Sequence, residues 1–253
     1  MLRRTLVIAL AALSLAACSS DEVTVGPEEP GTVAEMDAAI RSAASALLSQ
    51  ESAPMTVVYF GFDEDKEVLR YDWVDYRPGG DILVITKHLS EDETRGYSRI
   101  DGVWSMASVT SEDSLVWTTD VPEITGEETQ PGIGKLLAMV GQDSTTSDVF
   151  DTEASVVTQQ GASDGSVLWT LVSPYRSGET MATQQWIISP NGVLQFYIFY
   201  TENAATEYGT IIYEFGAGHQ TTDPVTAPEL GMPLRLDEFE IPDALRDLEN
   251  RES

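Results

Sequence analysis

Apolar positions follow two different spacings along the chain, which divide it into one helix and a long run of strands. Between Thr32 and Gln50 the apolar residues recur every three or four positions, so they share one side of a helix. Thr32 and Glu35 fit a capping box, the pattern in which both side chains satisfy free backbone N–H groups at a helix start. From Met55 onward the spacing changes to alternation of apolar and polar residues, which is typical of strands. Strands are predicted at 55–62, 68–76, 81–88, 96–100, 103–108, 114–119, 155–160, 166–173, 181–189, 193–201 and 210–216.

Short turn sequences between these strands predict hairpins, and therefore an antiparallel sheet. Asp101-Gly102 and Asn191-Gly192 are strong hairpin signals, because both dipeptides accept positive φ angles. The segments 194–200 and 211–215 are apolar at successive positions, so both faces of the sheet must be covered there. An antiparallel sheet of ten or eleven strands usually curls or splits.

One segment, from Pro122 to Ser147, interrupts the strands. Within it, Ile133–Val140 carries Leu136 and Leu137 at helical spacing and predicts a short amphipathic helix. Two interpretations stay open, a lid over the sheet or a surface helix that closes one end of the core. The predicted fold class is α+β and mostly β. It is a single curved antiparallel sheet, a half-barrel of about ten to eleven strands, with the N-terminal helix and the helical insert on its concave side.

The N-terminus predicts export and lipidation. Arg3 and Arg4 precede a mostly apolar stretch of 11 residues, Thr5–Leu15, which is too short to span a bilayer and suits a signal peptide. Small residues then lead into the single cysteine, in the order Leu-Ala-Ala-Cys of a bacterial lipobox. We expect cleavage between Ala17 and Cys18 and attachment of acyl chains to Cys18, which would place the protein on the outer face of a membrane in the cell envelope. The alternative is an ordinary secretory signal with an unrelated cysteine.

The sequence divides into four predicted parts. Residues 1–17 form the lipoprotein signal peptide, and residues 18–31, which are small and acidic with Pro and Gly, form a flexible tether. Residues 32–228 form the folded domain. Residues 229–253 form an acidic C-terminal extension that includes a strand and a short helix.

The balance of charge excludes some partners. Against 42 Asp and Glu the chain has 14 Lys and Arg, a formal charge of -28. Cleavage before Cys18 removes Arg3 and Arg4 and no acid, which takes the charge to -30. A chain with this charge is not expected to bind nucleic acid or to dock on anionic lipid through charge. Membrane association would therefore depend on the lipid anchor. A strong negative field would steer a basic partner, and acidity also suits solubility in a saline habitat.

The sequence carries no recognisable catalytic, cofactor or metal motif, although its acidic clusters, Asp63-Glu64-Asp65 and Asp237-Glu238-x-Glu240, could attract Ca²⁺ and are read as solvated surface. The two histidines, His88 and His219, stand at a predicted strand end and in a Gly-rich turn, where polar histidines are ordinary. There is no Gly-x-Ser-x-Gly elbow, no His-Glu-x-x-His and no phosphate loop. We therefore expect a protein that is not an enzyme and has no cofactor or metal.

The order of these elements resembles that of the LolA/LolB family and its mycobacterial relatives of the LppX and LprG type. The resemblance spans residues 32–228. It rests on the opening helix, Thr32–Gln50, on the hairpins Gly96–Trp104 and Trp186–Leu194, and on the closing strand Ile211–Phe215 with the Asp223–Pro228 passage. It implies a half-barrel whose apolar cavity, under helices, holds lipid or lipoprotein acyl chains.

Two functions from different classes follow. The first is an anchored lipoprotein that binds or carries a lipid or another hydrophobic ligand in such a cavity. The alternative is a non-transporting envelope module whose acidic surface binds a protein partner. For the first, we expect the cavity to be lined by apolar residues of the helices and aromatic residues of the strands, since ligand pockets are largely apolar with a few polar groups. Single aromatic residues among them would equally suit a filled core. The predicted lining residues are Met36, Ile40, Leu47, Tyr59, Tyr71, Trp73, Trp104, Trp117, Leu137, Trp169, Trp186, Phe196 and Tyr213.

Overall fold

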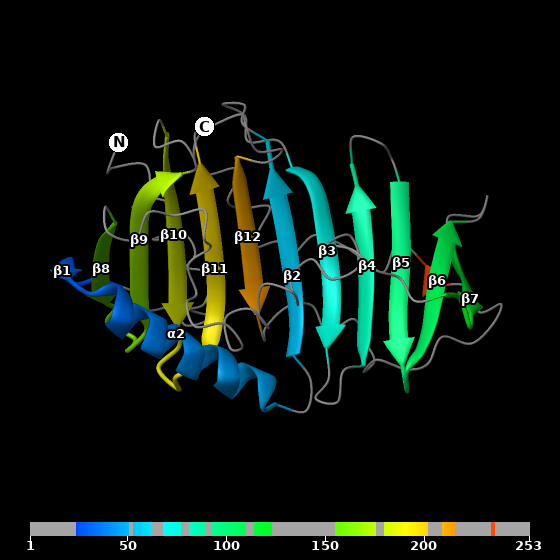
Figure 1. The fold of residues 1–253 in the computed structure, drawn as a ribbon, viewed down its shortest axis with the longest axis horizontal. Coiled ribbons are helices and arrows are strands. Elements are labelled where there is room, and N and C mark those ends of the chain that lie inside the picture. The colour runs from blue at the N-terminus through cyan, green and yellow to red at the C-terminus, as the bar shows by residue number, and fades with distance from the viewer. Residues whose placement is uncertain are drawn as a thin grey trace.

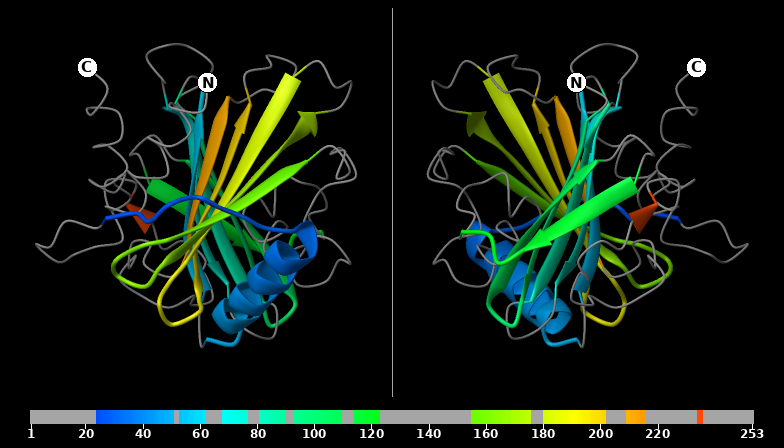
Figure 2. Two further views of the ribbon diagram at one scale, coloured as in Figure 1. Left: turned by 90° about the vertical axis from the view of Figure 1, so that its left-hand side faces the viewer. Right: turned by 90° about the vertical axis from the view of Figure 1, so that its right-hand side faces the viewer.

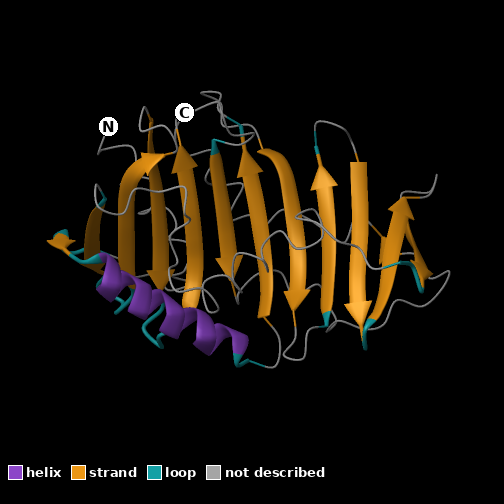
Figure 3. Cartoon of the chain, viewed as in Figure 1, coloured by secondary structure: helices purple, strands orange, loops and turns teal. Residues whose placement is uncertain are grey.

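The protein is one open antiparallel sheet with a helix laid across it (Figure 1). The structure, a computed structural model, describes residues 24–50, 53–61, 68–76, 81–89, 93–109, 114–122, 155–175, 180–201, 209–215 and 234–235. Within these residues, colouring by secondary structure shows a single helix and otherwise strands and short turns (Figure 3). The prediction of a mostly β fold built on one antiparallel sheet is confirmed.

Two meanders, joined side by side, make up the sheet. The first meander contains β2 (Ala53–Phe60), β3 (Val68–Tyr76), β4 (Ile82–His88), β5 (Glu93–Ile100), β6 (Val103–Val109) and β7 (Ser114–Thr119). The second contains β8 (Val156–Gly161), β9 (Val167–Tyr175), β10 (Thr180–Ile188), β11 (Leu194–Thr201) and β12 (Thr210–Phe215). Pairing of β12 with β2 joins the two meanders, and the strands within each follow chain order. These eleven strands coincide with the predicted ones to within three residues at each end.

The predicted hairpin turns have the backbone angles that their sequences require. Asp101 and Gly102 both have positive φ, 50° and 78°, as a two-residue turn of type I′ demands. In the β10–β11 hairpin the loop has three residues, Pro190-Asn191-Gly192, and only Gly192 has positive φ, 75°. Gly192 donates its N–H to the carbonyl of Ser189, so proline at the start and glycine at the end set this turn.

Helix α2 (Val33–Leu48) begins at the predicted capping box. Thr32 Oγ1 accepts the N–H of Glu35 at 3.2 Å, and Glu35 Oε2 accepts the N–H of Thr32 at 3.0 Å. One side of the helix is buried, including Met36, Ile40 and Leu47. This side packs against β10 and β11, and Figure 2 shows α2 on one side of the twisted sheet.

Both faces of the sheet are buried, as the apolar runs in β11 and β12 predict. We call the side that packs on α2 the helix face and the other side the opposite face. The helix-face core spans the sheet from β8 to β4, and its strand residues are Met55, Val74, Ile82, Val84, Val157, Trp169, Leu171, Trp186, Ile188, Leu194, Tyr197 and Phe215. The opposite-face core contains Val58, Phe60, Trp73, Ile85, Ala107, Trp117, Leu168, Ile187, Phe196, Ile198 and Ile212.

At one end of the sheet, residues 24–31 run along the edge of β8. Glu29 and Pro30 form the two-residue strand β1 (Glu29–Pro30), which pairs with Thr158 and Gln159. Further hydrogen bonds hold the ends of the segment, from the N–H of Gly31 to the carbonyl of Val157 and from Ser163 to Thr24. This part of the predicted tether is therefore docked on the sheet.

At the other end, β13 (Leu234–Arg235) pairs with β7, so the C-terminal extension contributes a strand to the fold. The predicted helix at 133–140, with Leu137, lies outside the described residues, as do Ala17, Cys18 and His219. No described helix is long and apolar enough to cross a membrane.

Candidate functional site

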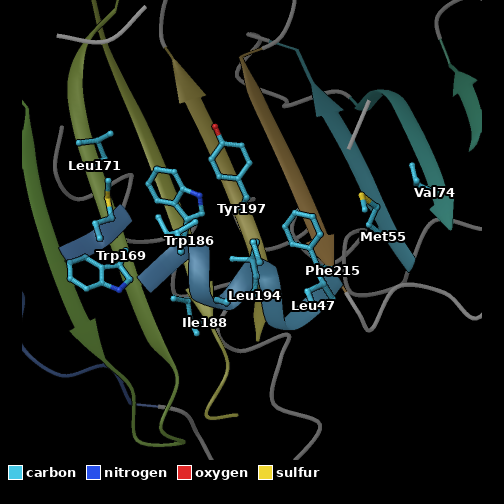
Figure 4. Close-up of a cluster of buried hydrophobic side chains, with 14 of the residues drawn as sticks. Leu47, Met55, Val74, Trp169, Leu171, Trp186, Ile188, Leu194, Tyr197 and Phe215 are labelled. Carbon is cyan, nitrogen blue, oxygen red and sulfur yellow. The ribbon is translucent and has the colours of Figure 1, made fainter. Parts of the chain in front are cut away.

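A row of aromatic side chains crosses the helix face above α2 (Figure 4). Trp186, Tyr197 and Tyr213 stand directly opposite one another on β10, β11 and β12. Ring centroids are 5.3 Å apart for Trp186 and Tyr197 and 5.1 Å apart for Tyr197 and Tyr213. Phe215 stacks on Tyr213 at 6.3 Å with an interplanar angle of 17°. Strand alternation explains the row, since every second residue of each strand faces α2.

Polar groups are buried next to this row. They lie on the same face of the sheet, further along the strands from α2. The hydroxyl of Tyr197 points away from the helix in Figure 4 and donates to Oε1 of Gln184 at 2.8 Å. Gln184 is fully buried, and its Nε2 has no hydrogen-bond partner within the described structure. Ser173 Oγ and Trp186 Nε1 are also buried, and neither has a partner in that part of the chain. Buried polar atoms in folded proteins are nearly always paired, so three unpaired donors on neighbouring positions of β9 and β10 require an explanation.

A buried ion pair lies on the same face of the sheet, on β3. Arg70 and Asp72 are two residues apart, so they lie on the same face of the strand. Arg70 donates two hydrogen bonds to Asp72, whose side chain is fully buried. The guanidinium also lies 4.9 Å from the ring centroid of Tyr59, and the Tyr59 hydroxyl hydrogen-bonds to Asp72.

The tyrosines of this region are held in the protonated form. Burial raises the pKa of Tyr59 well above its usual value, and the charge of Asp72 raises it further. Burial likewise raises the pKa of Tyr197 and of Tyr213. A protonated tyrosine donates a hydrogen bond but does not accept a proton from a substrate. The site therefore combines apolar rings with neutral donors, which suits binding of an apolar molecule that carries acceptor oxygens.

The predicted cavity residues divide between the two faces. Those on the helix face are Met36, Ile40, Leu47, Tyr59, Trp104, Trp169, Trp186 and Tyr213. Those on the opposite face are Trp73, Trp117 and Phe196. The backbone pairing of Tyr71 with Val58 places Tyr71 with the second group, but its side chain lies outside the described structure. The helix-face group and the opposite-face group cannot line one space, because the sheet separates them.

Sequence reasoning missed the polar members of the site. The adjacent glutamines Gln184 and Gln185 stand in the apolar strand β10, so one of them has to be buried on each face. Two adjacent glutamines in an apolar strand are therefore a sequence signal for a buried polar group. Arg70 and Asp72 look like solvent-facing residues of an alternating strand, and only the fold shows them buried with Tyr59.

No group of three or more metal-ligating side chains occurs among the described residues. His88 lies at the end of β4, half-buried, opposite Arg70 on β3.

Known proteins resemble this chain in structure rather than in sequence. No protein-family model matches the sequence, and the search of curated proteins found no relative. Among solved structures, the crystal structure of LprF from Mycobacterium bovis matches with a TM-score of 0.41 and 12% sequence identity, over 79% of this chain and 98% of that chain. At 12% identity the two proteins share few side chains, so a function of this chain must depend on its own residues.

Proposed function

We propose that the protein is a bacterial envelope lipoprotein, anchored through Cys18, that binds the acyl chains of a hydrophobic ligand against the helix face of its sheet. Residues 18–23 would connect the anchor to the domain. Export and anchoring follow from the basic start, the short apolar stretch and the single cysteine after small residues.

The observation that carries ligand binding is the row of aromatic rings on the helix face, next to buried donors that have no partner in the described structure. The apolar surface around this row is broad. The helix-face core runs across eight neighbouring strands, from β8 to β4, which is a width of about 34 Å at a strand spacing of ~4.8 Å. Helix α2 has 16 residues and is about 24 Å long and ~10 Å wide. Helix α2 packs on β10 and β11 and so contacts only part of this face. A broad apolar surface with aromatic rings and a few buried donors suits the acyl chains of a ligand.

Extraction of the purified protein tests the proposal. The full chain with Cys18→Ser cannot carry its own acyl anchor, so any acyl lipid that it releases into organic solvent is a ligand. We expect mass spectrometry to find about one lipid per protein molecule. Recovery of no lipid from this variant, together with no uptake of added lipid, would overturn the proposal.

Fractionation of cells tests the anchor separately. The native chain should be recovered with membranes, and the Cys18→Ser variant should lose that association, because two or more acyl chains provide stable anchoring. Equal membrane association of the two proteins would refute an anchor at Cys18 and leave ligand binding to be judged by extraction.

A second candidate function is an interaction module that binds a basic partner. It is favoured by the formal charge of -28, because a field of one sign steers oppositely charged proteins. Partners captured through this field should be lost between low and high salt, since salt screens exposed charges. A set of partners that does not change with salt would count against it.

A further inference from the structure

Three buried donors stand together on the helix face without hydrogen-bond partners in the described structure. They are Nε2 of Gln184, Oγ of Ser173 and Nε1 of Trp186, from residues that are fully buried. An unpaired donor removed from water costs free energy, and folds tolerate this cost chiefly where function requires it. A ligand that supplies acceptors would remove the cost.

The register places the three donors in one patch. Gln184 and Trp186 are two residues apart on β10, so their side chains emerge from the same face about 7 Å apart. Ser173 on β9 is directly opposite Ala182, the next residue of β10 on that face. The patch therefore runs along one strand, from the aromatic row at Trp186 toward Ser173.

The neighbours of the patch decide which way the glutamine amide faces. Tyr197 is protonated because burial raises its pKa, and its hydroxyl donates to Oε1 of Gln184. The amide oxygen is thus occupied, and Nε2 is left as the free donor. Apolar side chains flank it, since Phe199 is its partner on β11 and Leu171 its partner on β9.

We propose that Gln184, Ser173 and Trp186 bind the carbonyl oxygens of an acyl ester or acyl carboxyl group, with the acyl chains along the aromatic row. This assignment rests on the proposed function and names the polar part of its ligand. All three donors are neutral. Arg70, a buried cation on the same face, lies four strands away on β3 and is paired with the buried Asp72. Anionic headgroups such as phosphate select charged donors, so a neutral carbonyl fits this patch better.

Equilibrium binding to the full chain carrying Cys18→Ser tests the assignment with three probes. Dioleoylglycerol has ester carbonyls, oleic acid has a carboxyl group, and 1-octadecene has neither. Gln184→Leu keeps the size and removes the donor; it is made and compared in a Tyr197→Phe background, so that no tyrosine hydroxyl is left without its acceptor. We expect this variant to bind dioleoylglycerol or oleic acid about threefold to tenfold more weakly, as loss of a neutral hydrogen bond implies, and to bind 1-octadecene unchanged.

The next residue of the same strand provides a matched control. Gln185 is also buried, but it faces the other side of the sheet, where it donates to Thr170 Oγ1 at 3.3 Å. Gln185→Leu should leave binding of all three probes unchanged. A direct readout comes from infrared spectra of the ¹³C-labelled carbonyl, whose band should shift on binding to the Tyr197→Phe background protein and shift less on binding to Gln184→Leu.

The outcomes separate this assignment from the proposed function. If Gln184→Leu binds the carbonyl probes as the Tyr197→Phe background protein does, with the same carbonyl band, the assignment is wrong while ligand binding stands. If the native protein binds none of the probes, both are wrong. Should Gln184→Leu not fold, Ser173→Ala replaces it, with the same selective loss expected. Weaker dioleoylglycerol binding identifies an ester ligand, and weaker oleic acid binding identifies a carboxyl ligand.

Discussion

The guanidinium of Arg70 donates two hydrogen bonds to the carboxylate of Asp72, from Nε to Oδ1 at 3.0 Å and from the second terminal nitrogen to Oδ2 at 3.1 Å. Asp72 has no exposed side-chain surface, and Arg70 retains 13%. Replacing Arg70 by methionine keeps most of the volume but leaves a buried carboxylate without its cation. We expect Arg70→Met to lower the free energy of unfolding by about 3–5 kcal/mol, measured by urea denaturation.

Replacing both members of the pair is the control for that variant. Arg70→Met combined with Asp72→Leu removes the buried charge together with its partner, so most of the lost stability should return. If the double variant is as unstable as Arg70→Met alone, packing rather than the unpaired carboxylate explains the loss.

Glycine at position 96 is required by the side chains above it on the opposite face. A Cβ there would lie 2.8 Å from Cβ of Ala107 and 3.0 Å from the indole of Trp117. We expect Gly96→Ala to destabilise the protein by about 1–3 kcal/mol, the usual cost of overpacking. Thermal unfolding would measure it, and a smaller loss from the same change made in a Trp117→Leu background would identify the indole as the obstacle.

Glu214 on β12 should make stability depend on pH, because burial raises its pKa. The protonated form is favoured in the folded state. Its contribution to stability is therefore complete below the unfolded pKa of about 4.3 and is lost as the pH rises through the folded pKa. Glu214→Gln mimics the protonated form, so the variant should be more stable than the native protein at pH 7 and equal to it near pH 4. A difference in stability that does not change over this range would contradict the prediction.

Ser173 has a buried hydroxyl with no partner in the described structure. Ser173→Ala removes the hydroxyl and its desolvation cost, so we expect the ligand-free protein to gain about 1 kcal/mol in free energy of unfolding. Chemical denaturation after removal of lipid measures the gain. Lower stability of Ser173→Ala would mean that the hydroxyl is satisfied in the folded protein.

The fold was largely predictable because each long strand carries its own local signal. Val68–Tyr76 and Ser114–Thr119 were predicted with the bounds that the structure gives, since alternation ends there at turn residues. The helix start was predictable because Thr32 and Glu35 are close in sequence. The docking of Glu29 and Pro30 on β8 was not, because an acidic segment with Pro and Gly carries no strand pattern, and its pairing depends on an edge formed about 130 residues later.

The candidate site was only partly predictable for a related reason. Alternation shows that Trp73 and Trp186 each occupy a buried face, but it does not show that these are different faces, because the relation between strands depends on register. The structure places Trp73 opposite Thr56 and Trp186 opposite Tyr197, on two sides of one sheet. The polar members depend on several strands at once, since Tyr59 and Asp72 meet only through the pairing of β2 with β3.

Docking of residues 24–31 on β8 limits how far the domain can stand from a membrane. A free tether from Cys18 to Gly31 would reach about 45 Å when extended, but the hydrogen bonds between Thr24 and Ser163 leave only residues 19–23 between anchor and sheet. Six Cα steps reach about 20 Å. With an anchor at Cys18, the turn between β8 and β9 would stay within that height of the bilayer surface, and the sheet would have one fixed end toward the lipid rather than rotate freely above it.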